Sequence, residues 1–348
     1  MKKIIFSLIL LFPLAINAVS TSASKAILMD MDSNRIIYAK NIHTPQSVAS
    51  ISKIMTAIVA IESGKLDDEI TINNSIFKAY GSAIYIKEGE KIYLRDLVYG
   101  LMLRSGNDAA LAIADYVGGD VNNFVKNMNE KAEKIGMKNT TFNNPSGLDE
   151  KDGNFSTAYD MAILTSYAMK NKEYRKIVST QKYKVSTNKN NYLWKNKNKL
   201  LKIYKYATGG KTGYTKKAKR TLVTTASNKN INLVAVTLND GNDFKDHMNL
   251  FEYAFNTYDK CRILKSGKIN IYNEKYYKNY ILYIKEDFDY ILDNSEKEII
   301  NLKYNIYKQS KIKSGREIGN IEIKIGDKVI HKEKIYIRKK TKKKWHLW

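Results

Sequence analysis

The 348-residue chain is poor in the residue types that build disulfides and metal sites. It has a single cysteine, Cys261, so an intrachain disulfide is excluded. Its four histidines are scattered, and no His, Cys and Asp side chains recur at the spacing of metal ligands. We therefore expect no metal and no cofactor. Cys261 has no histidine near it in the sequence and is not a candidate nucleophile.

Long apolar runs are missing beyond the first residues of the chain. Two lysines precede an apolar run over residues 4–14, and small residues follow it. This order is typical of a secretory signal peptide over residues 1–18, cleaved after Ala18 or, as a second choice, after Ser20. A membrane span needs about 20 apolar residues, and polar residues begin at Asn17, so a span is the weaker alternative. We expect an exported protein, in the periplasm or on the outer face of the cytoplasmic membrane.

Acidic residues are few relative to basic ones. The chain has 35 Asp and Glu against 59 Lys and Arg, which gives a net charge of +24. Such a charge attracts nucleic acid, anionic lipid or an anionic cell-wall polymer. The alternative is a codon bias, since the chain is rich in Lys, Asn, Ile and Tyr, and this bias would give the same charge without an anionic partner. Most lysines are scattered, except in the basic aromatic tail, residues 338–348. Its lysines and tryptophans suit an anionic membrane surface, and a charged terminus without a partner is the alternative.

Ser-Ile-Ser-Lys at residues 50–53 is the first of three short motifs that carry chemistry. A helix is predicted over residues 50–61, which places Ser50 and Lys53 on one face. Lysine ordinarily has a pKa of about 10.4, and it becomes a useful base when burial or a second cation favours its neutral form. We expect Ser50 to be the nucleophile and Lys53 the general base. A serine and a lysine on a solvated helix are the alternative.

Ser-Gly-Asn at residues 105–107 falls between two predicted helices, residues 94–103 and 108–116. The hydroxyl of Ser105 could relay a proton from the nucleophile to a leaving amine. The amide of Asn107 could hold Lys53 and a substrate carbonyl. A helix C-cap followed by an N-cap would also explain these residues.

Lys-Thr-Gly at residues 211–213 begins a region of predicted strands. Lys211 and Thr212 could bind the terminal carboxylate of a substrate, and Gly213 leaves room for a peptide along the strand edge. Lys211 would also be the second cation that lowers the pKa of Lys53. The backbone N–H groups of Ser50 and Tyr214 would then form an oxyanion hole. A turn that leads into an exposed strand is the alternative.

The predicted elements divide the chain into two parts. Strands near both ends of residues 19–261 enclose a series of helices, which indicates an α+β domain with an antiparallel sheet. The strands are predicted at 25–31, 36–40, 221–226 and 233–238, and the helices at 50–61, 94–103, 108–116, 121–135, 157–169 and 244–258. From about residue 262 the pattern alternates with a period of two, as in 300–306 and 321–325, which indicates strands with one buried face. We expect a small β-sandwich-like domain over residues 262–337.

The residues around the three motifs resemble the site motifs of the low-molecular-mass penicillin-binding proteins. More narrowly, they are similar to the serine-type D-alanyl-D-alanine carboxypeptidases. The segments that carry the resemblance are 48–57, 105–109, 142–148, 156–162 and 210–215. The resemblance is strong over residues 24–258, and residues 315–334 are similar to the second domain of this family. It implies a β-lactamase/transpeptidase-like α+β fold followed by a small all-β domain.

The resemblance also implies a role for four residues. Ser50 would form the acyl ester, Lys53 would be the base, Ser105 the proton relay and Lys211 the carboxylate binder. One departure lies after the third motif, where the usual Ala-Gly pair is Ala218-Lys219. A lysine in place of glycine predicts an altered loop there. A second departure is that the amphipathic C-terminal anchor of the family is shortened to the basic aromatic tail.

These observations favour a DD-carboxypeptidase that removes the terminal D-alanine from the pentapeptide stems of peptidoglycan. It would act through an acyl-enzyme on Ser50, and β-lactams would acylate the same serine. A DD-endopeptidase that cuts crosslinks with the same site is an alternative. A class A β-lactamase is disfavoured, because its Ser-Asp-Asn motif is Ser-Gly-Asn here and no glutamate is placed for deacylation. A non-catalytic protein that binds a polyanion or the cell wall is a further alternative, favoured by the charge of +24. The three motifs would then be a coincidence. We therefore favour the enzyme and expect no nucleic-acid partner.

Overall fold

The computed structural model describes residues 19–149, 153–271, 276–309 and 313–340. The predicted signal peptide and residues 341–348 of the basic aromatic tail lie outside these residues. No helix in the described part of the chain has both the length and the apolar character needed to cross a membrane.

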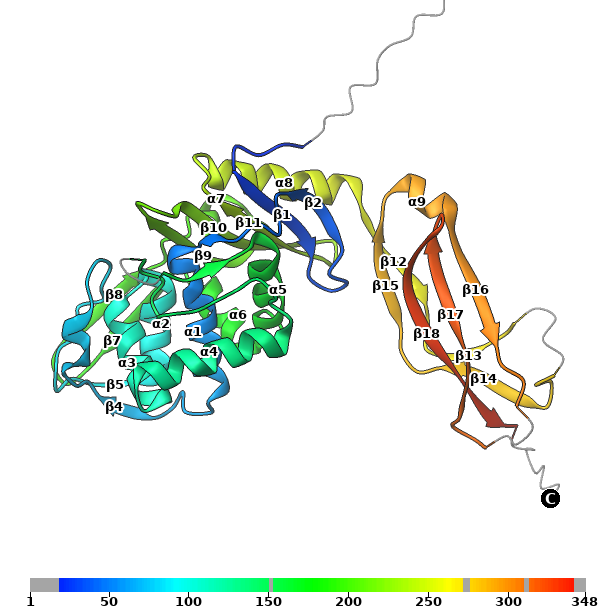
Figure 1. Cartoon of the computed structure of the whole chain (residues 1–348), viewed down its shortest axis with the longest axis horizontal. Coiled ribbons are helices and arrows are strands. Elements are labelled where there is room, and N and C mark those ends of the chain that lie inside the picture. Colours follow the sequence, from blue (N-terminus) through cyan, green and yellow to red (C-terminus); the bar gives the residue numbers. More distant parts are fainter. Residues whose placement is uncertain (1–18, 150–152, 272–275, 310–312, 341–348) are drawn as a thin grey trace, which may run out of the picture.

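Strands open and close the first part of the chain, and helices fill its middle (Figure 1). The helices are α1 (Lys53–Glu62), α2 (Leu94–Arg104), α3 (Asn107–Gly118), α4 (Val121–Ile135), α5 (Ala158–Ala168), α6 (Lys172–Ser179), α7 (Leu200–Ile203), α8 (Asp243–Thr257) and α9 (Asn294–Ile299), with 3-10 turns η1 (Ala49–Ser52) and η2 (Asn74–Lys78). The strands before residue 240 are β1 (Lys25–Asp30), β2 (Ile36–Lys40), β3 (Gln46–Ser47), β4 (Glu69–Thr71), β5 (Lys91–Tyr93), β6 (Phe155–Ser156), β7 (Lys182–Ser186), β8 (Asn191–Lys195), β9 (Ala207–Thr215), β10 (Lys219–Asn228) and β11 (Ile231–Leu238). Each helix and strand predicted in this part is present, within a few residues of its predicted bounds.

A five-stranded antiparallel sheet forms the centre of this α+β domain, in the order β2-β1-β11-β10-β9. Successive side chains of a strand point to opposite faces, and β1 shows this directly. Ile27 and Met29 join the core on the side of α1 and α5, whereas Leu28 packs with Leu250 and Phe251 of α8 on the other side. The sheet is therefore covered on both faces, and β9 is left at its edge, where its backbone faces the 3-10 turn that carries Ser50.

Local capping signals explain where the helices begin and end. Thr157 accepts a hydrogen bond from the N–H of Asp160 and begins α5, as its sequence predicts. Gly136 ends α4 with a φ of 89°, a left-handed conformation that glycine adopts without a steric penalty. The first helix differs from its prediction. It begins at Lys53 rather than Ser50, because residues 49–52 form a tighter 3-10 turn.

The C-terminal domain is built from two sheets. Its strands are β12 (Asp259–Leu264), β13 (Gly267–Ile269), β14 (Tyr280–Ile284), β15 (Phe288–Leu292), β16 (Ile300–Ile306), β17 (Glu317–Ile325) and β18 (Lys328–Lys339). β12 pairs with β15, and the larger sheet has the order β13-β14-β18-β17-β16. This confirms a β-rich second domain, although α9 makes it less than all-β. Asp293 and Glu296 begin α9 with a reciprocal capping box.

Two C-terminal strands, β16 and β17, share the same alternation of apolar and polar residues, but their apolar side chains are buried to different extents. Ile321 and Ile323 of β17 are fully buried, as predicted. The prediction is wrong for β16, where Leu302 and Tyr304 are 37% and 38% exposed. β16 is an edge strand of the sheet, and the core on the buried side of the sheet extends only partly beneath it.

Arg35 joins the two domains. It follows β1 in the peptide that leads to β2, and its guanidinium donates 2.6 Å hydrogen bonds to the Ile291 carbonyl of β15 and to Glu296 of α9. The same guanidinium lies over the rings of Tyr258 and Tyr290, at 4.8 and 5.2 Å from their centres. Because Arg35 is only 12% exposed, this contact is well shielded from water.

Candidate active site

Ser50 lies on a strained turn that the rest of the domain holds in place. The preceding residue, Ala49, is buried and has a φ of 53°, a left-handed conformation that is unfavourable for alanine. Gly147 packs against this turn so closely that a Cβ at its position would lie 2.0 Å from the Ala49 carbonyl oxygen. This close contact requires glycine at position 147, and it packs the loop against the backbone of the turn that carries Ser50.

Lys53 lies directly behind Ser50 and is completely buried. Its Nζ lies 3.1 Å from Ser50 Oγ and 2.7 Å from Asn107 Oδ1, and it also contacts the Ser146 carbonyl oxygen. Burial lowers the pKa of Lys53 to about 7, and the positive charge of Lys197 contributes to this shift, while Asp108 opposes it. A large fraction of Lys53 is therefore neutral at neutral pH, with its nitrogen within reach of the serine hydroxyl.

The Ser-Gly-Asn turn stands on the other side of Lys53. Ser105 ends α2 in a left-handed conformation, with a φ of 66°, and is 4% exposed. Asn107 begins α3, and its amide nitrogen donates to the Tyr80 carbonyl oxygen at 2.6 Å. Asn107 thus holds Lys53, as expected. One of the two N–H groups of this amide is used by Tyr80, and contact of the amide with a substrate carbonyl stays a prediction.

Lys211 enters the site from β9 and meets Ser105. Its Nζ lies 3.0 Å from Ser105 Oγ and 2.7 Å from the Thr212 carbonyl oxygen, and the residue is 1% exposed. Burial, followed by the charges of Lys53 and Lys197, lowers the pKa of Lys211 well below its ordinary value. Lys197 is thus a cation that lowers the pKa of Lys53, whereas the sequence had suggested only Lys211 for this role.

Gly213 is required by the close approach of β9 to the Ser50 turn. A Cβ at this position would lie 3.0 Å from the Ser50 nitrogen and 2.4 Å from Thr221 Oγ1. The absence of a side chain thus lets β9 approach the backbone of the Ser50 turn. Tyr214 itself is 63% exposed, with its ring beside the opening of the site.

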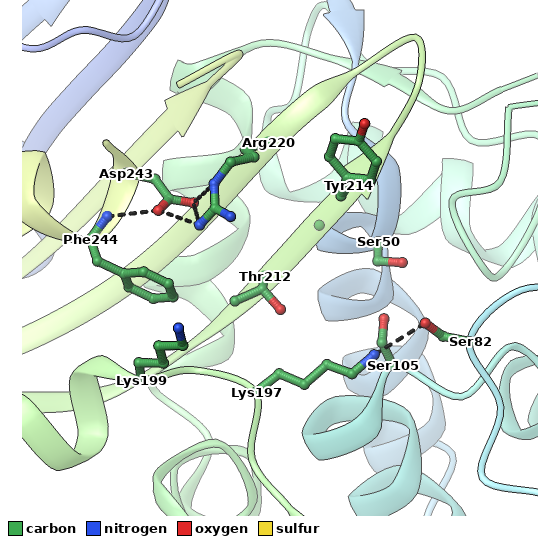
Figure 2. A pocket seen from close by; sticks show the side chains of 11 residues that line it. Ser50, Ser82, Ser105, Lys197, Lys199, Thr212, Tyr214, Arg220, Asp243 and Phe244 are labelled. Carbon is green, nitrogen blue, oxygen red and sulfur yellow. Dashed lines mark hydrogen bonds and ion pairs between the residues drawn. The ribbon is translucent and has the colours of Figure 1, made fainter. Parts of the chain in front are cut away.

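A cavity of about 350 Å³ opens in front of Ser50 (Figure 2). The predicted residues on its wall are Ser50, Ser105, Thr212, Gly213 and Tyr214, and the others are Ser82, Lys197, Lys199, Arg220, Asp243 and Phe244. Lys53 and Lys211 do not line it, because both lie beneath its floor. The two lysines of the motifs are therefore buried behind the cavity wall, where they contact the hydroxyls of Ser50 and Ser105 that line it.

Sequence reasoning missed Lys197 and Ser146. Lys197 belongs to the short segment after β8 and is brought to the site by a hydrogen bond from its N–H to the Leu103 carbonyl oxygen. Ser146 lies in a segment that resembled the family, but a backbone carbonyl carries no residue-type signal. In the part of the chain that the structure describes, no three His, Cys, Asp or Glu side chains cluster to hold a metal ion.

This arrangement is suited to acyl transfer by a serine. The geometry supplies a hydroxyl, a buried amine with a pKa near neutrality, a second hydroxyl at 3.0 Å from a second lysine, and a strand edge with backbone N–H groups beside them. All eight residues that the sequence singled out converge on this one region, either on the cavity wall or directly beneath it.

Two family models match the chain. Residues 14–242 match the family model of D-alanyl-D-alanine carboxypeptidase, and residues 258–343 match that of the C-terminal domain of penicillin-binding protein 5.

Curated relatives and solved structures extend over nearly the whole chain. The D-alanyl-D-alanine carboxypeptidase DacF of Bacillus subtilis is 30% identical, over 92% of this chain and 86% of the relative. DacD of Escherichia coli is 30% identical, over 88% of this chain and 84% of the relative. Penicillin-binding protein 5 of Haemophilus influenzae has a similar structure, with a TM-score of 0.81 and 27% identity over 93% of this chain and 98% of that one.

Proposed function

Because the chain belongs to the D-alanyl-D-alanine carboxypeptidase family and is a serine-type enzyme that acts on peptidoglycan, we propose that it removes the terminal D-alanine from pentapeptide stems through an acyl-enzyme on Ser50. The observation that carries this proposal is the position of Lys53. Its fully buried Nζ, with a pKa of about 7, lies 3.1 Å from Ser50 Oγ. A neutral amine at that distance can accept the serine proton as the hydroxyl attacks the substrate carbonyl.

The first half of the reaction forms an ester and releases D-alanine. Ser50 Oγ attacks the carbonyl carbon between the two D-alanines, and the N–H groups of Ser50 and Tyr214 stabilise the oxyanion. The proton taken by Lys53 must reach the leaving nitrogen. Ser105 is the proposed relay, since its hydroxyl faces both the cavity and Lys211. Collapse of the tetrahedral intermediate then breaks the peptide bond.

The second half is hydrolysis of the ester. A water molecule attacks the acyl carbon, Lys53 or Ser105 takes its proton, and the proton returns to Ser50 Oγ as the tetrapeptide leaves. A β-lactam presents a similar carbonyl and carboxylate, so we propose that it acylates Ser50 by the same first step. Its ring opens without a departing fragment, and the adduct is hydrolysed slowly.

The remaining assignments concern the chain outside the site. We propose that residues 19–261 form the peptidase domain and residues 262–337 the C-terminal domain, with β12 (Asp259–Leu264) crossing from one into the other. We also propose that the protein is exported, with its signal peptide over residues 1–18. The lysines and tryptophans of the basic aromatic tail support contact with an anionic membrane surface as a further proposal.

The test combines a penicillin with a pentapeptide. We expect the wild-type protein to gain the mass of one penicillin and to release D-alanine from an uncrosslinked pentapeptide, and Ser50→Ala to do neither. Thr56→Ser serves as the matched control, because it is a buried change in α1, one turn after Lys53. A Ser50→Ala protein that retains most of its D-alanine release would refute the proposal. Cleavage of crosslinked dimers without release of free D-alanine would favour the endopeptidase instead.

A further inference from the structure

The loop of residues 80–85 contributes to the wall of the active-site cavity and is tied to the Ser-Gly-Asn turn. Ser82 of this loop lines the cavity (Figure 2). The backbone N–H of Asn107 donates to the Ser82 carbonyl oxygen at 2.7 Å, and its side-chain amide donates to the Tyr80 carbonyl oxygen at 2.6 Å. Because Asn107 Oδ1 also accepts from Lys53, a movement of this loop would reach the proposed base.

The carboxylate of Asp108, at the start of α3, holds the other end of the same loop. Asp108 is 5% exposed and accepts hydrogen bonds from three backbone N–H groups. The N–H of Ile84 contacts both of its oxygens at 3.0 and 3.1 Å, and the N–H groups of Tyr85 and Ala109 contact one oxygen each, at 2.7 and 2.9 Å. These N–H groups replace the water that a carboxylate loses on burial.

Asp108 has no cationic partner in the part of the chain that the structure describes. None of the ion pairs there includes it. Its position is therefore determined by the backbone of the loop, and the position of the loop is determined by Asp108.

Two neighbouring residues show how tightly this contact is built. Tyr85 has a φ of 65°, a left-handed conformation that is unfavourable for tyrosine, and it is 76% exposed, so burial of its ring does not offset the strain. A Cβ at Gly106 would lie 2.8 Å from Asp108 Oδ1 and 3.0 Å from Ile84 Cγ2. The middle residue of the Ser-Gly-Asn motif thus leaves the space that the carboxylate and the loop occupy.

We propose that Asp108 is a positioning residue for the acyl transfer, because its carboxylate fixes the loop of residues 80–85 against the Ser-Gly-Asn turn. The loop then holds Asn107, and Asn107 holds Lys53 within reach of the Ser50 hydroxyl. This inference rests on the proposed function, since it concerns the rate at which Ser50 is acylated.

The charge of Asp108 also acts on the proposed base. Burial lowers the pKa of Lys53 and Lys197 adds to this effect, whereas Asp108 opposes it. The other titratable groups that face this pair are Lys211 on β9, whose pKa is lowered by burial and by Lys53, and Tyr192 on β8, whose pKa is raised by burial with a contribution from Asp108. Loss of the Asp108 charge would therefore lower the pKa of Lys53 further.

The experiment measures the second-order rate of acylation of Ser50 by penicillin between pH 5 and 9. The first variant is Asp108→Asn, which removes the charge and places an NH₂ group, a donor, against the N–H groups of the loop. The second is Gly106→Ala, which displaces the carboxylate and keeps its charge. Asp160→Asn is the matched control, because Asp160 is also buried and accepts from a backbone N–H, that of Asn139 at 2.7 Å, but does not line the cavity.

For Asp108→Asn we expect the plateau rate at high pH to fall about 10- to 100-fold, because the base is displaced from the hydroxyl. The pH midpoint of acylation should move below about 7, because the pKa of Lys53 falls. Gly106→Ala should lower the plateau rate by a similar factor and leave the midpoint near about 7. Asp160→Asn should lower the free energy of unfolding, with its acylation rate within about twofold of the wild type and its midpoint unchanged.

An Asp108→Asn protein with the plateau rate and the midpoint of the wild type would overturn the inference. An equal change in Asp160→Asn would also overturn it, since the effect would then come from a loss of stability. If Asp108→Asn did not fold, a wild-type rate in Gly106→Ala would overturn the inference alone. In each of these cases the wild-type protein would still be acylated on Ser50, so the proposed function would stand. A wild-type protein that gained no penicillin on Ser50 would overturn both.

Discussion

Lys53 is the residue on which the chemistry depends most directly, and its pKa determines the pH dependence of the reaction. Only the neutral amine accepts a proton, and burial lowers the pKa of Lys53 to about 7. We therefore expect the second-order rate of acylation by penicillin to rise with pH through about 7 and to level off above about 8. Stopped-flow or mass-spectrometric acylation rates between pH 5 and 9 would measure this.

Lys53→Arg is the sharpest control for that profile. An arginine side chain keeps its charge at every pH of the experiment, so acylation should fall by about 10²- to 10⁴-fold across the whole range. A wild-type rate that is flat from pH 5 to 9, or an arginine variant that acylates at a comparable rate, would show that Lys53 is not the base.

For single residues, the sequence predicted which side chains carry the chemistry better than it predicted the groups that surround them in the fold. Ser50, Lys53 and Ser105 were found because their chemistry is tied to short local spacing. Lys197 was not found, since nothing in its neighbourhood in the sequence places it beside Leu103. The electrostatics of the site depend on such long-range contacts, and for this reason the effect of Lys197 on Lys53 was not predicted.

The hairpin between β9 and β10 shows the effect of one residue on an element. Lys219 stands where the resemblance to the family predicts glycine, and its φ of 59° is left-handed. That conformation costs an L-residue about 1–2 kcal/mol, and glycine avoids this cost while losing more entropy on folding. We expect Lys219→Gly to raise the free energy of unfolding by about 0.5–1 kcal/mol, measured by chemical denaturation.

Lys216→Gly is the matched change in the same turn, because Lys216 is also exposed but lies outside the left-handed region. It should lower stability by a similar amount, through the greater entropy of glycine in the unfolded chain. If both variants changed stability in the same direction, the conformation of Lys219 would not be the cause.

Elements with strong local signals were predictable, and those decided by their surroundings were not. Gly136 and Thr157 mark helix ends by their own chemistry, and both ends were found. The alternation in β16 indicated a buried face that the edge position of this strand does not provide. The capping box of Asp293 and Glu296 was visible in the sequence, and α9 was overlooked because the surrounding pattern is that of strands.

Arg35, which no sequence pattern singled out, makes a contact between the two domains. It is shielded from water, paired with Glu296 and stacked near two tyrosines, so its loss should cost about 2–4 kcal/mol of contact between the domains. In Arg35→Ala we expect faster proteolysis near β12 and separate unfolding of the two domains by calorimetry. D-alanine release from a soluble pentapeptide should stay within about twofold of the wild type, because Arg35 does not line the cavity.

Arg262→Ala provides the comparison, since Arg262 also pairs with two carboxylates, Asp287 and Asp289, but within the C-terminal domain and with 49% of its side chain exposed. It should leave proteolysis near the junction unchanged. If Arg35→Ala unfolded in a single transition and resisted protease as the wild type does, the domains would be held by other contacts, such as the Lys260–Asp32 ion pair. If both arginine variants increased proteolysis near β12 equally, the effect would come from a change within the C-terminal domain. It would then not come from the contact that Arg35 makes between the two domains.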